Sequence, residues 1–235
     1  MRIVALIPAF NEESHIVQTL TAVEKIKLVE EIVVVNDGSV DDTLALALQF
    51  QKKASVKTTV LNQAENQGKG AALNYGLANV AADIYLLLDA DLGDTAVLAV
   101  DLLEPVLTGE AQMSIARFVA GQSSAKSKMG FGVVRRTAVL GVRLLTGVRV
   151  SSPLSGQRAV KSEVLQSIGQ LPTGFGVEVS LTVGALHHGF QIVEVPLAMK
   201  HRAYGRGFQG FKHRGQQMIH VLQALWSCWK KGWHQ

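Results

Sequence analysis

Residues 84–91 read Ile-Tyr-Leu-Leu-Leu-Asp-Ala-Asp, an apolar run that ends in two carboxylates. The run from Ile84 to Leu88 predicts a strand buried on both faces, as in the centre of a parallel sheet. Its end would then lie at the carboxyl edge of that sheet, where open α/β sheets bind ligands. Asp89 and Asp91 could hold a divalent cation against a diphosphate there. Aspartate is also common where a strand meets a turn, so the rest of the chain has to distinguish the two interpretations.

The composition indicates a folded protein that binds anionic partners. The chain has 235 residues, 48% of them hydrophobic, which is enough for one well-buried domain. Its formal charge is +4, and most of its Lys and Arg residues follow residue 125. Because the first half lacks the interleaved aromatic residues of a base-stacking surface, we expect no nucleic-acid partner. Phosphorylated small molecules or an anionic membrane surface fit this charge distribution better.

The chain shows no targeting or membrane-spanning pattern. It begins with a strand pattern, so we expect no signal peptide. No stretch reaches the ~18 uninterrupted apolar residues of a spanning helix. Cys228 is the single cysteine, which excludes an intrachain disulfide and a cysteine metal cluster. We therefore expect a cytoplasmic protein, one that can also lie on the inner face of the cell membrane.

Strands and helices are expected to alternate through the first half of the chain. Apolar runs predict strands at 2–7, 31–36, 56–61, 84–88 and 111–118. Between them, helices are predicted that end near residue 26, open at 41–43, and occupy 69–79 and 95–108. This alternation is typical of right-handed βαβ units, and so of a mostly parallel, Rossmann-like sheet flanked by helices. The polar loops after the strands would share one edge of that sheet.

The second half contains more loops and more basic residues. Loops are predicted at 121–128, 151–156 and 202–212. Helices are predicted at 131–145, 161–168 and 177–188, with a last one that ends near residue 233. Residues 191–201 predict one long strand, or two short strands broken at Pro196.

Four motifs of the first half, in this order and spacing, resemble those of family 2 glycosyltransferases. They are IPAFNEE at 7–13, VVNDGSVDDT at 34–43, NQGKGAALN at 66–74 and LLLDADL at 86–92. The resemblance implies a hexosyltransferase with the A-type nucleotide-sugar fold, an α/β fold. It also implies a nucleotide-sugar donor, with a UDP-sugar favoured over a GDP-sugar. We expect one domain, 1–235, in which 1–118 bind the donor and 119–235 the acceptor.

The resemblance implies that residues of the first loops bind the donor: Pro8, Ala9, Phe10, Glu12, Asp37, Lys69, Asp89 and Ala90. Asp37 could accept from a base N–H group, and Glu12 from ribose hydroxyls. An Asx turn and a helix N-terminal charge would explain the same two acids without a ligand. Lys69, between two glycines, supplies a cation near the diphosphate or the base; alternatively, it is a solvated lysine of a first helical turn.

A divalent cation, Mg²⁺ or Mn²⁺, is the cofactor that the resemblance implies. Asp91 is the expected direct ligand and a catalytic residue, with Asp89 shared between the metal and the ribose. His201 could complete the metal shell, although a lone histidine is more often structural. The ion would neutralise the diphosphate leaving group as the glycosidic bond breaks.

Segments of the second half resemble two groups of transferases. SGQRAV, GFGVEVSLTVGALHHGFQIVEVPL and HRAYGRG resemble polyprenyl-phosphate sugar transferases, the group of the dolichyl-phosphate enzymes. SPLSGQRAV through TGFGVEV is also similar to glucosyl-3-phosphoglycerate synthase, a retaining enzyme. Gly93 departs from the dolichyl-phosphate pattern, which usually has Gln at this position.

The acceptor site is expected around Glu178, which the resemblance places as general base or acceptor-binding acid. An ionised phosphate acceptor needs no base, in which case Glu178 would only position groups. A helix-dipole partner is the alternative without a ligand. Arg202 and Arg206 could bind the diphosphate or an acceptor phosphate through their guanidinium groups.

Two helices bear on membrane contact. Residues 131–145 predict a basic amphipathic helix, and the last helix carries an apolar stripe that ends in Lys and Trp. A core-packing or dimer helix explains the stripe equally well. We therefore expect a metal-dependent transferase that moves a sugar to a phosphate-bearing acceptor, with a polyprenyl phosphate favoured. The alternatives are a retaining synthase with phosphoglycerate as acceptor and a non-catalytic nucleotide-sugar-binding protein.

Overall fold

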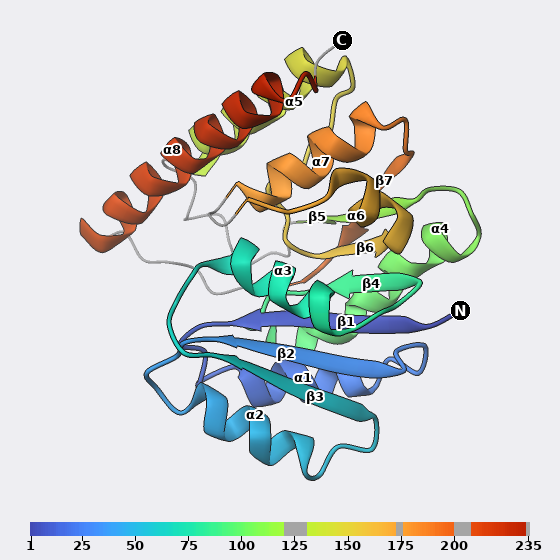
Figure 1. The fold of residues 1–235 in the computed structure, drawn as a ribbon, viewed down its shortest axis with the longest axis vertical. Helices are drawn as coiled ribbons and strands as arrows, with labels where there is room; N and C mark the ends of the chain where they lie inside the picture. The colour runs from blue at the N-terminus through green and yellow to red at the C-terminus, as the bar shows by residue number, and fades with distance from the viewer. Residues whose placement is uncertain (120–130, 173–175, 200–207, 234–235) are drawn as a thin grey trace.

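A seven-stranded sheet runs through the chain in the computed structural model, which describes residues 1–119, 131–172, 176–199 and 208–233 (Figure 1). Its strand order is β3-β2-β1-β4-β6-β5-β7. The strands are β1 Ile3–Ala9, β2 Glu31–Asp37, β3 Lys57–Gln63, β4 Ile84–Leu87, β5 Met113–Phe118, β6 Arg158–Lys161 and β7 Ile192–Leu197. All described neighbours pair in parallel except β6, which is antiparallel to β4 and β5. The predicted mostly parallel α/β sheet is confirmed.

Helices cover both faces of the sheet (Figure 1). One face carries α1 Ile16–Glu24, α2 Thr43–Gln51, the 3₁₀ helix η1 Gly93–Leu102 and α4 Leu103–Leu107. The other carries α3 Lys69–Asn79, α5 Phe131–Thr146, α6 Ser162–Ile168, α7 Val177–His187 and α8 Phe208–Lys230. Alternate side chains of β1 enter the two cores, with Ala5 on the α1 side and Leu6 on the α3 side. The central strands are therefore buried on both faces, as their apolar runs predict.

The structure corrects three element predictions and decides between two alternatives for a fourth. Residues 95–108 form η1 and α4 instead of one α-helix, because Pro105 cannot donate to a carbonyl four residues earlier. Strand β6, which the sequence did not predict, gains its partners β4 and β5 only in the fold. Strand β7 is one strand that runs through Pro196, which agrees with the first of the two alternatives for 191–201, since at the sheet edge a missing N–H costs no ladder bond. Helix α8 begins at Phe208, so residues 208–212 are helical despite Gly210.

None of the helices in the described part of the chain combines the length and the apolar content that crossing a bilayer requires.

Candidate active site

The carboxyl ends of β1, β2, β3 and β4 meet at one edge of the sheet (Figure 1). In the parallel register, Ala9 of β1 lies opposite Asn36 of β2, which in turn lies opposite Asn62 of β3. The loops at 8–12, 36–42, 66–69 and 89–91 therefore gather there, as the sequence predicts.

Lys69 lies at the centre of the site. Its Nζ is 2.5 Å from Asp89 Oδ1 and 2.7 Å from Glu178 Oε1. Burial alone would lower the pKa of Lys69, but the charges of Asp89 and Glu178 outweigh it and the pKa is raised. Lys69 is thus a firmly charged ion-pair partner, and its interpretation as a solvated lysine is wrong.

Two residues of the segment before β6 complete the surroundings of Asp89. Gln157 Nε2 donates to Asp89 Oδ2 at 2.6 Å, so both carboxylate oxygens accept from protein groups. A Cβ atom on Gly156 would lie 2.5 Å from Lys69 Nζ and 2.7 Å from Asp89 Oδ2. Sequence reasoning missed both residues. The SGQRAV motif was their only signal, and it points to this segment without showing what it contacts.

Asp37 fixes the loop that leads into α3. Its buried carboxylate accepts from the backbone N–H groups of Gln67 at 2.8 Å and Gly68 at 2.9 Å. Gly68 has φ +90°, a conformation that favours glycine. Asp37 is therefore bound to a loop about 30 residues later in the chain, and the local Asx turn does not explain it.

Comparison with known proteins assigns the family. The family model described as glycosyl transferase family 2 matches residues 4–131. The chain belongs to glycosyl transferase family 2. This confirms the resemblance drawn from the four motifs, all of which lie within the matched residues.

Two curated relatives of this family 2 chain match most of its length. Dolichol-phosphate mannosyltransferase of Pyrococcus furiosus is 25% identical over 234 residues, which cover 98% of this chain and 64% of that protein. Glucosyl-3-phosphoglycerate synthase of Mycobacterium tuberculosis is 32% identical over 193 residues, which cover 76% of this chain and 59% of that protein. The chain thus spans about six tenths of the length of these two relatives.

The fold matches a solved glycosyltransferase. The crystal structure of the M. tuberculosis synthase with Mn²⁺, UDP-glucose and phosphoglyceric acid superposes with a TM-score of 0.74 at 28% identity. The match covers 95% of this chain and 79% of that one. A further structure of that enzyme holds Mg²⁺ with UDP. The A-type fold predicted from the motifs is confirmed for this family 2 chain.

Other predicted donor residues of the family 2 chain lie along the same edge. Phe10 is 42% exposed, whereas Pro8 is partly buried and Ala9 and Ala90 are buried. The Glu12 carbonyl accepts from the first N–H groups of α1, and its carboxylate lies 3.5 Å from His15 Nδ1. A helix-terminal charge therefore accounts for Glu12 in part.

The turn after β4 explains Gly93. Thr19, fully buried in α1, donates to the Ala90 carbonyl at 2.8 Å and accepts from the Gly93 N–H at 2.9 Å. Gly93 has φ +54°, which a glutamine would adopt only with strain. The departure from the dolichyl-phosphate pattern is therefore built into the turn that carries Asp91.

Arg158 connects the segment before β6 to helix α7 beside the site. It is fully buried and donates to the carbonyls of Ser155 at 2.8 Å and Pro153 at 2.9 Å, and to Thr182 Oγ1 at 3.0 Å. Burial lowers the pKa of Arg158 to about 10, against the opposing charges of Glu178, Glu194 and Asp89. These bonds tie the segment that carries Gln157 to α7.

The metal shell is only partly within the described residues. Asp91 follows Asp89 in the turn, and its Oδ1 atom is buried. The described residues contain no group of three or more potential metal ligands. The predicted ligand His201, and with it Arg202 and Arg206, lies outside the described residues.

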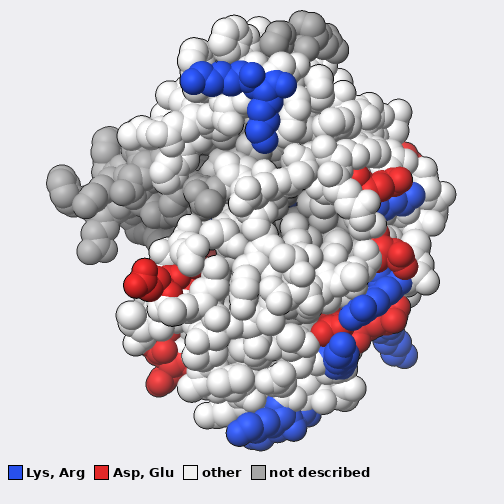
Figure 2. All heavy atoms as spheres, viewed as in Figure 1, with Lys and Arg blue, Asp and Glu red and all other residues white. Residues whose placement is uncertain are grey.

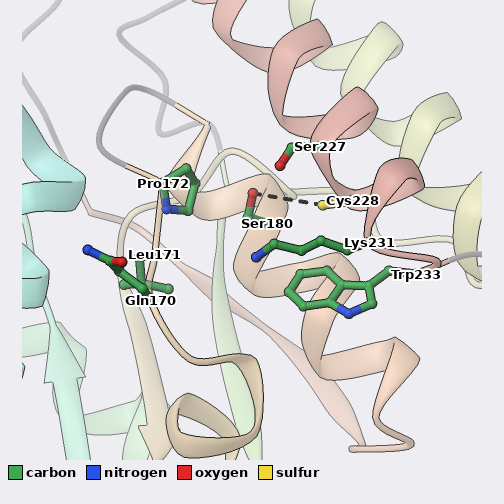
Figure 3. A pocket seen from close by; sticks show the side chains of 8 residues that line it. All are labelled: Gln170, Leu171, Pro172, Ser180, Ser227, Cys228, Lys231 and Trp233. Carbon is green, nitrogen blue, oxygen red and sulfur yellow. Dashed lines mark hydrogen bonds between the residues drawn. The ribbon is translucent and has the colours of Figure 1, made fainter.

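A cavity of about 380 Å³ lies beyond this site, between α7, α8 and residues 170–172 (Figure 3). Ser180 of α7 and Cys228 of α8 both line it, and the Cys228 thiol donates to Ser180 Oγ at 3.8 Å. Lys231 extends into it beside Trp233. Among the described residues, none of the predicted donor or metal residues lines this cavity.

Proposed function

We propose that this protein transfers a sugar from a nucleotide-sugar donor, a UDP-sugar, to a phosphate-bearing acceptor, with a polyprenyl phosphate as the favoured acceptor. The observation that carries the proposal is the meeting of Lys69, Asp89 and Glu178 at the sheet edge beside Asp91. The solved synthase binds UDP-glucose, Mn²⁺ and phosphoglyceric acid together, and the archaeal relative is a dolichol-phosphate mannosyltransferase. Phosphoglycerate is therefore the alternative acceptor.

The donor base is proposed to bind beside Asp37 and Asn36, within residues 1–118. Asn36 is buried and its Nδ2 donates to Asn62 Oδ1 at 2.7 Å. Its Oδ1 finds no hydrogen-bond donor among the described residues. A buried acceptor of this kind is costly unless a ligand or water donates to it, and a base N–H group would do so.

The carboxylates of Asp91 and Asp89 fit Mg²⁺ or Mn²⁺, because hard cations prefer oxygen ligands. Both oxygens of Asp89 already accept from Lys69 and Gln157, which makes Asp91 the first ligand. When bound, a divalent cation supplies charge neutralisation for the leaving diphosphate. Glu178, in the half formed by residues 119–235, faces the acceptor.

Helices α5 and α8 are proposed to rest on the cytoplasmic face of the cell membrane. Each presents an apolar stripe on the side opposite its buried one: Val133, Leu140 and Leu144 in α5, and Ile219, Leu222, Trp226 and Trp229 in α8, all at least half exposed. Neither helix contains an acidic residue. Figure 2 shows basic and no acidic side chains among the coloured residues in the upper part of the view, near the end of α8. A second copy would place like charges together, whereas anionic lipids complement them.

Replacing Asp91 tests the transferase proposal. Asp91→Asn removes a charge from the cation site with little change of shape, so UDP binding in the presence of Mn²⁺ should weaken by about 100-fold. A change of this size equals the interaction free energy that shifts a pKa by about two units. Titration calorimetry measures the binding, and turnover should fall with it. Asp94→Asn, an exposed acid three residues later, is the matched control and should bind UDP like the wild type.

Two outcomes would contradict this function. Unchanged Mn²⁺-dependent UDP binding in Asp91→Asn would exclude the metal assignment. A wild type that binds UDP with Mn²⁺ but neither hydrolyses nor transfers any sugar of a UDP- and GDP-sugar panel would instead be a nucleotide-sugar-binding protein.

A further inference from the structure

The cavity between α7 and α8 lies on a different side of α7 from the candidate active site. Glu178 bonds Lys69 at the start of α3, whereas Ser180 contacts Cys228 of α8. Because a helix turns by about 100° per residue, these two positions of α7 point nearly opposite ways. The cavity beside Ser180 is therefore a separate place on the molecule, and the transferase function proposed above makes no use of it.

Small residues of α7 let α8 approach on either side of Ser180. Gly176, Ser180 and Gly184 recur every four positions and so share one side of the helix. A Cβ atom on Gly176 would lie 2.5 Å from the Cβ atom of Ala224. One on Gly184 would lie 3.0 Å from the Trp233 ring. Ser180 lies between these two close contacts, only 4% exposed, and lines the cavity.

The end of α8 holds Lys231 and Trp233 beside the cavity. Gly232 has φ +74°, and its N–H donates to the Trp229 carbonyl at 3.0 Å. The Trp233 N–H donates to the Cys228 carbonyl, also at 3.0 Å. These two bonds form the Schellman motif, which ends many helices at a glycine. They fix the backbone from which Lys231 extends into the cavity (Figure 3).

The cavity wall offers hydrogen-bond donors that no acceptor in the described part of the chain uses. The Ser180 hydroxyl accepts a weak thiol contact, but its own proton has no acceptor there. The Lys231 ammonium lies 4.4 Å from the centre of the Trp233 ring and pairs with no carboxylate among the described residues. Ser227 and Gln170 add a hydroxyl and an amide to the lining, whose described residues include no Asp or Glu. A positive charge with several donors and no acidic neighbour favours an anion.

A phosphate group suits this lining better than a carboxylate does. Lysine binds phosphate as a point charge, and hydroxyl groups from two helices can reach different oxygens of a tetrahedral anion. A planar carboxylate is matched best by the fork of an arginine. The volume of about 380 Å³ lies at the small end of ligand pockets and exceeds what a phosphate group alone needs. Leu171, Pro172 and Trp233 supply apolar surface for an organic substituent.

We propose that the cavity between α7 and α8 binds a phosphate monoester. Its phosphate group contacts Lys231, Ser180 and Ser227, and its carbon body lies against Leu171 and Trp233. A soluble phosphorylated metabolite and the head group of a phosphatidate share this chemistry. The inference is independent of the transferase function, because it uses none of the residues assigned to donor, metal or acceptor.

Calorimetry with phenyl phosphate tests the proposed site, because this monoester joins a doubly charged phosphate to an apolar ring. The wild-type protein should bind it. Lys231→Gln should weaken binding by about 10- to 100-fold and Ser180→Ala by about tenfold, as expected for hydrogen bonds to a charged group. Lys230→Gln removes the same charge one residue earlier, from a lysine that lies over the Trp226 ring, and should bind like the wild type. Circular dichroism verifies that each variant is folded.

A wild type that does not bind phenyl phosphate would overturn the inference. Equal losses in Lys231→Gln and Lys230→Gln would overturn it as well, since they would show general attraction to a basic surface. NMR of the indole N–H groups locates the ligand: phenyl phosphate should shift the signal of Trp233. The signals of Trp226 and Trp229, which stack on each other in the exposed stripe, should not move. A shift confined to these two would place the ligand outside the cavity.

Two further probes identify the source of the phosphate group. Glycerol 3-phosphate represents a soluble metabolite, and dihexanoyl phosphatidic acid represents a lipid head group. The one that displaces phenyl phosphate at the lower concentration gives the source, and displacement by either supports the site. Failure of both to displace it would show that the aromatic ring is recognised without the phosphate, and would overturn the inference. Each outcome leaves the transferase function as it stands, because Lys231 is not among the residues proposed for it.

Discussion

Gly156 shows how closely the site is packed around its charged groups. Its missing side chain leaves room for both Lys69 Nζ and the Asp89 carboxylate. In Gly156→Ala the new methyl group would push the ends of the Lys69 and Asp89 side chains apart. These side chains can move, whereas Arg158 holds the neighbouring backbone through the carbonyls of Pro153 and Ser155. We expect kcat/KM for the donor to fall by more than about tenfold, with a loss of stability of about 1–3 kcal/mol.

The control for this substitution is Gly132→Ala. Gly132 lies in α5, and a Cβ atom there would have nothing within 4 Å. Alanine in a helix should stabilise the protein by up to about 1 kcal/mol and leave activity unchanged. Urea denaturation and initial rates measure both variants. Equal activities of the two would show that the space at Gly156 does not matter to the site.

Helix α5 has two apolar faces, of which only one is covered. Val134, Ala138 and Val142 are buried in the core, whereas Leu140 is 57% and Leu144 74% exposed on the opposite side. Arg136 and Arg143 flank the exposed stripe, at three- and four-residue spacings from its apolar side chains. A helix that faces only water does not need this second stripe. This second stripe is the observation on which the membrane proposal rests.

Substitutions on this stripe test the membrane proposal without touching the site. Leu140→Glu with Leu144→Glu should weaken binding to anionic vesicles by more than about tenfold, since each change removes apolar area and adds a repelled charge. Flotation with phosphatidylglycerol vesicles at low salt measures the binding. Val40→Glu, at an 89% exposed position outside both helices, should float like the wild type. Wild-type protein that fails to float would contradict the proposal.

The elements that the sequence predicted well are those with local patterns. The strands β1, β2 and β4 follow from apolar runs that end in polar loops, and α7 from a continuous apolar segment. The strand β6 begins and ends with a charged residue, so local pattern predicts a surface segment. It is a strand because β4 and β5 pair with it on either side. Arg158 at its start is fully buried for the same non-local reason.

The same distinction holds for the site. Lys69, Asp89 and Glu178 could each be selected from motifs, and the structure brings them together. Their ion pairs could not be predicted, because Lys69 and Glu178 belong to segments 109 residues apart. Gln157 could not be found either, since it reaches Asp89 only through the antiparallel pairing of β6 with β4.

One sheet contains strands from both parts of the chain, residues 1–118 and residues 119–235. Strands β3, β2, β1, β4 and β5 lie before or end at residue 118, whereas β6 and β7 follow it. Strand β6 lies between β4 and β5, and β7 pairs with β5, so the two parts of the chain share one sheet. The candidate site lies at the carboxyl edge of the sheet. Charged residues at the opposite edge are outside the site and can contribute to the stability of the fold. Glu31, the first residue of β2, lies at that opposite edge.

Glu31 makes the free energy of unfolding depend on pH in the acid range. It is buried at the start of β2 and accepts from Thr59 Oγ1 at 2.6 Å, and it pairs with Lys57 at 3.0 Å and with Arg2. Burial alone would raise the pKa of Glu31, but these partners outweigh it and the pKa lies below its ordinary value of 4.5. A lowered carboxyl pKa stabilises the fold above pH 4.5, and this contribution is lost as the pH falls through the folded value.

Glu31→Gln should therefore flatten the acid side of the stability curve. At pH 7 we expect a loss of about 1.5–3 kcal/mol, typical of a hydrogen-bonded charged group. The difference from the wild type should shrink as the pH drops below 4.5, because the wild-type carboxyl group then becomes neutral as well. Melting temperatures between pH 3 and 7 measure the effect, with Glu30→Gln, at the exposed neighbouring position, as control. A difference between Glu31→Gln and the wild type that stays constant over this range would show that Glu31 stabilises the sheet by shape and hydrogen bonding, without its charge.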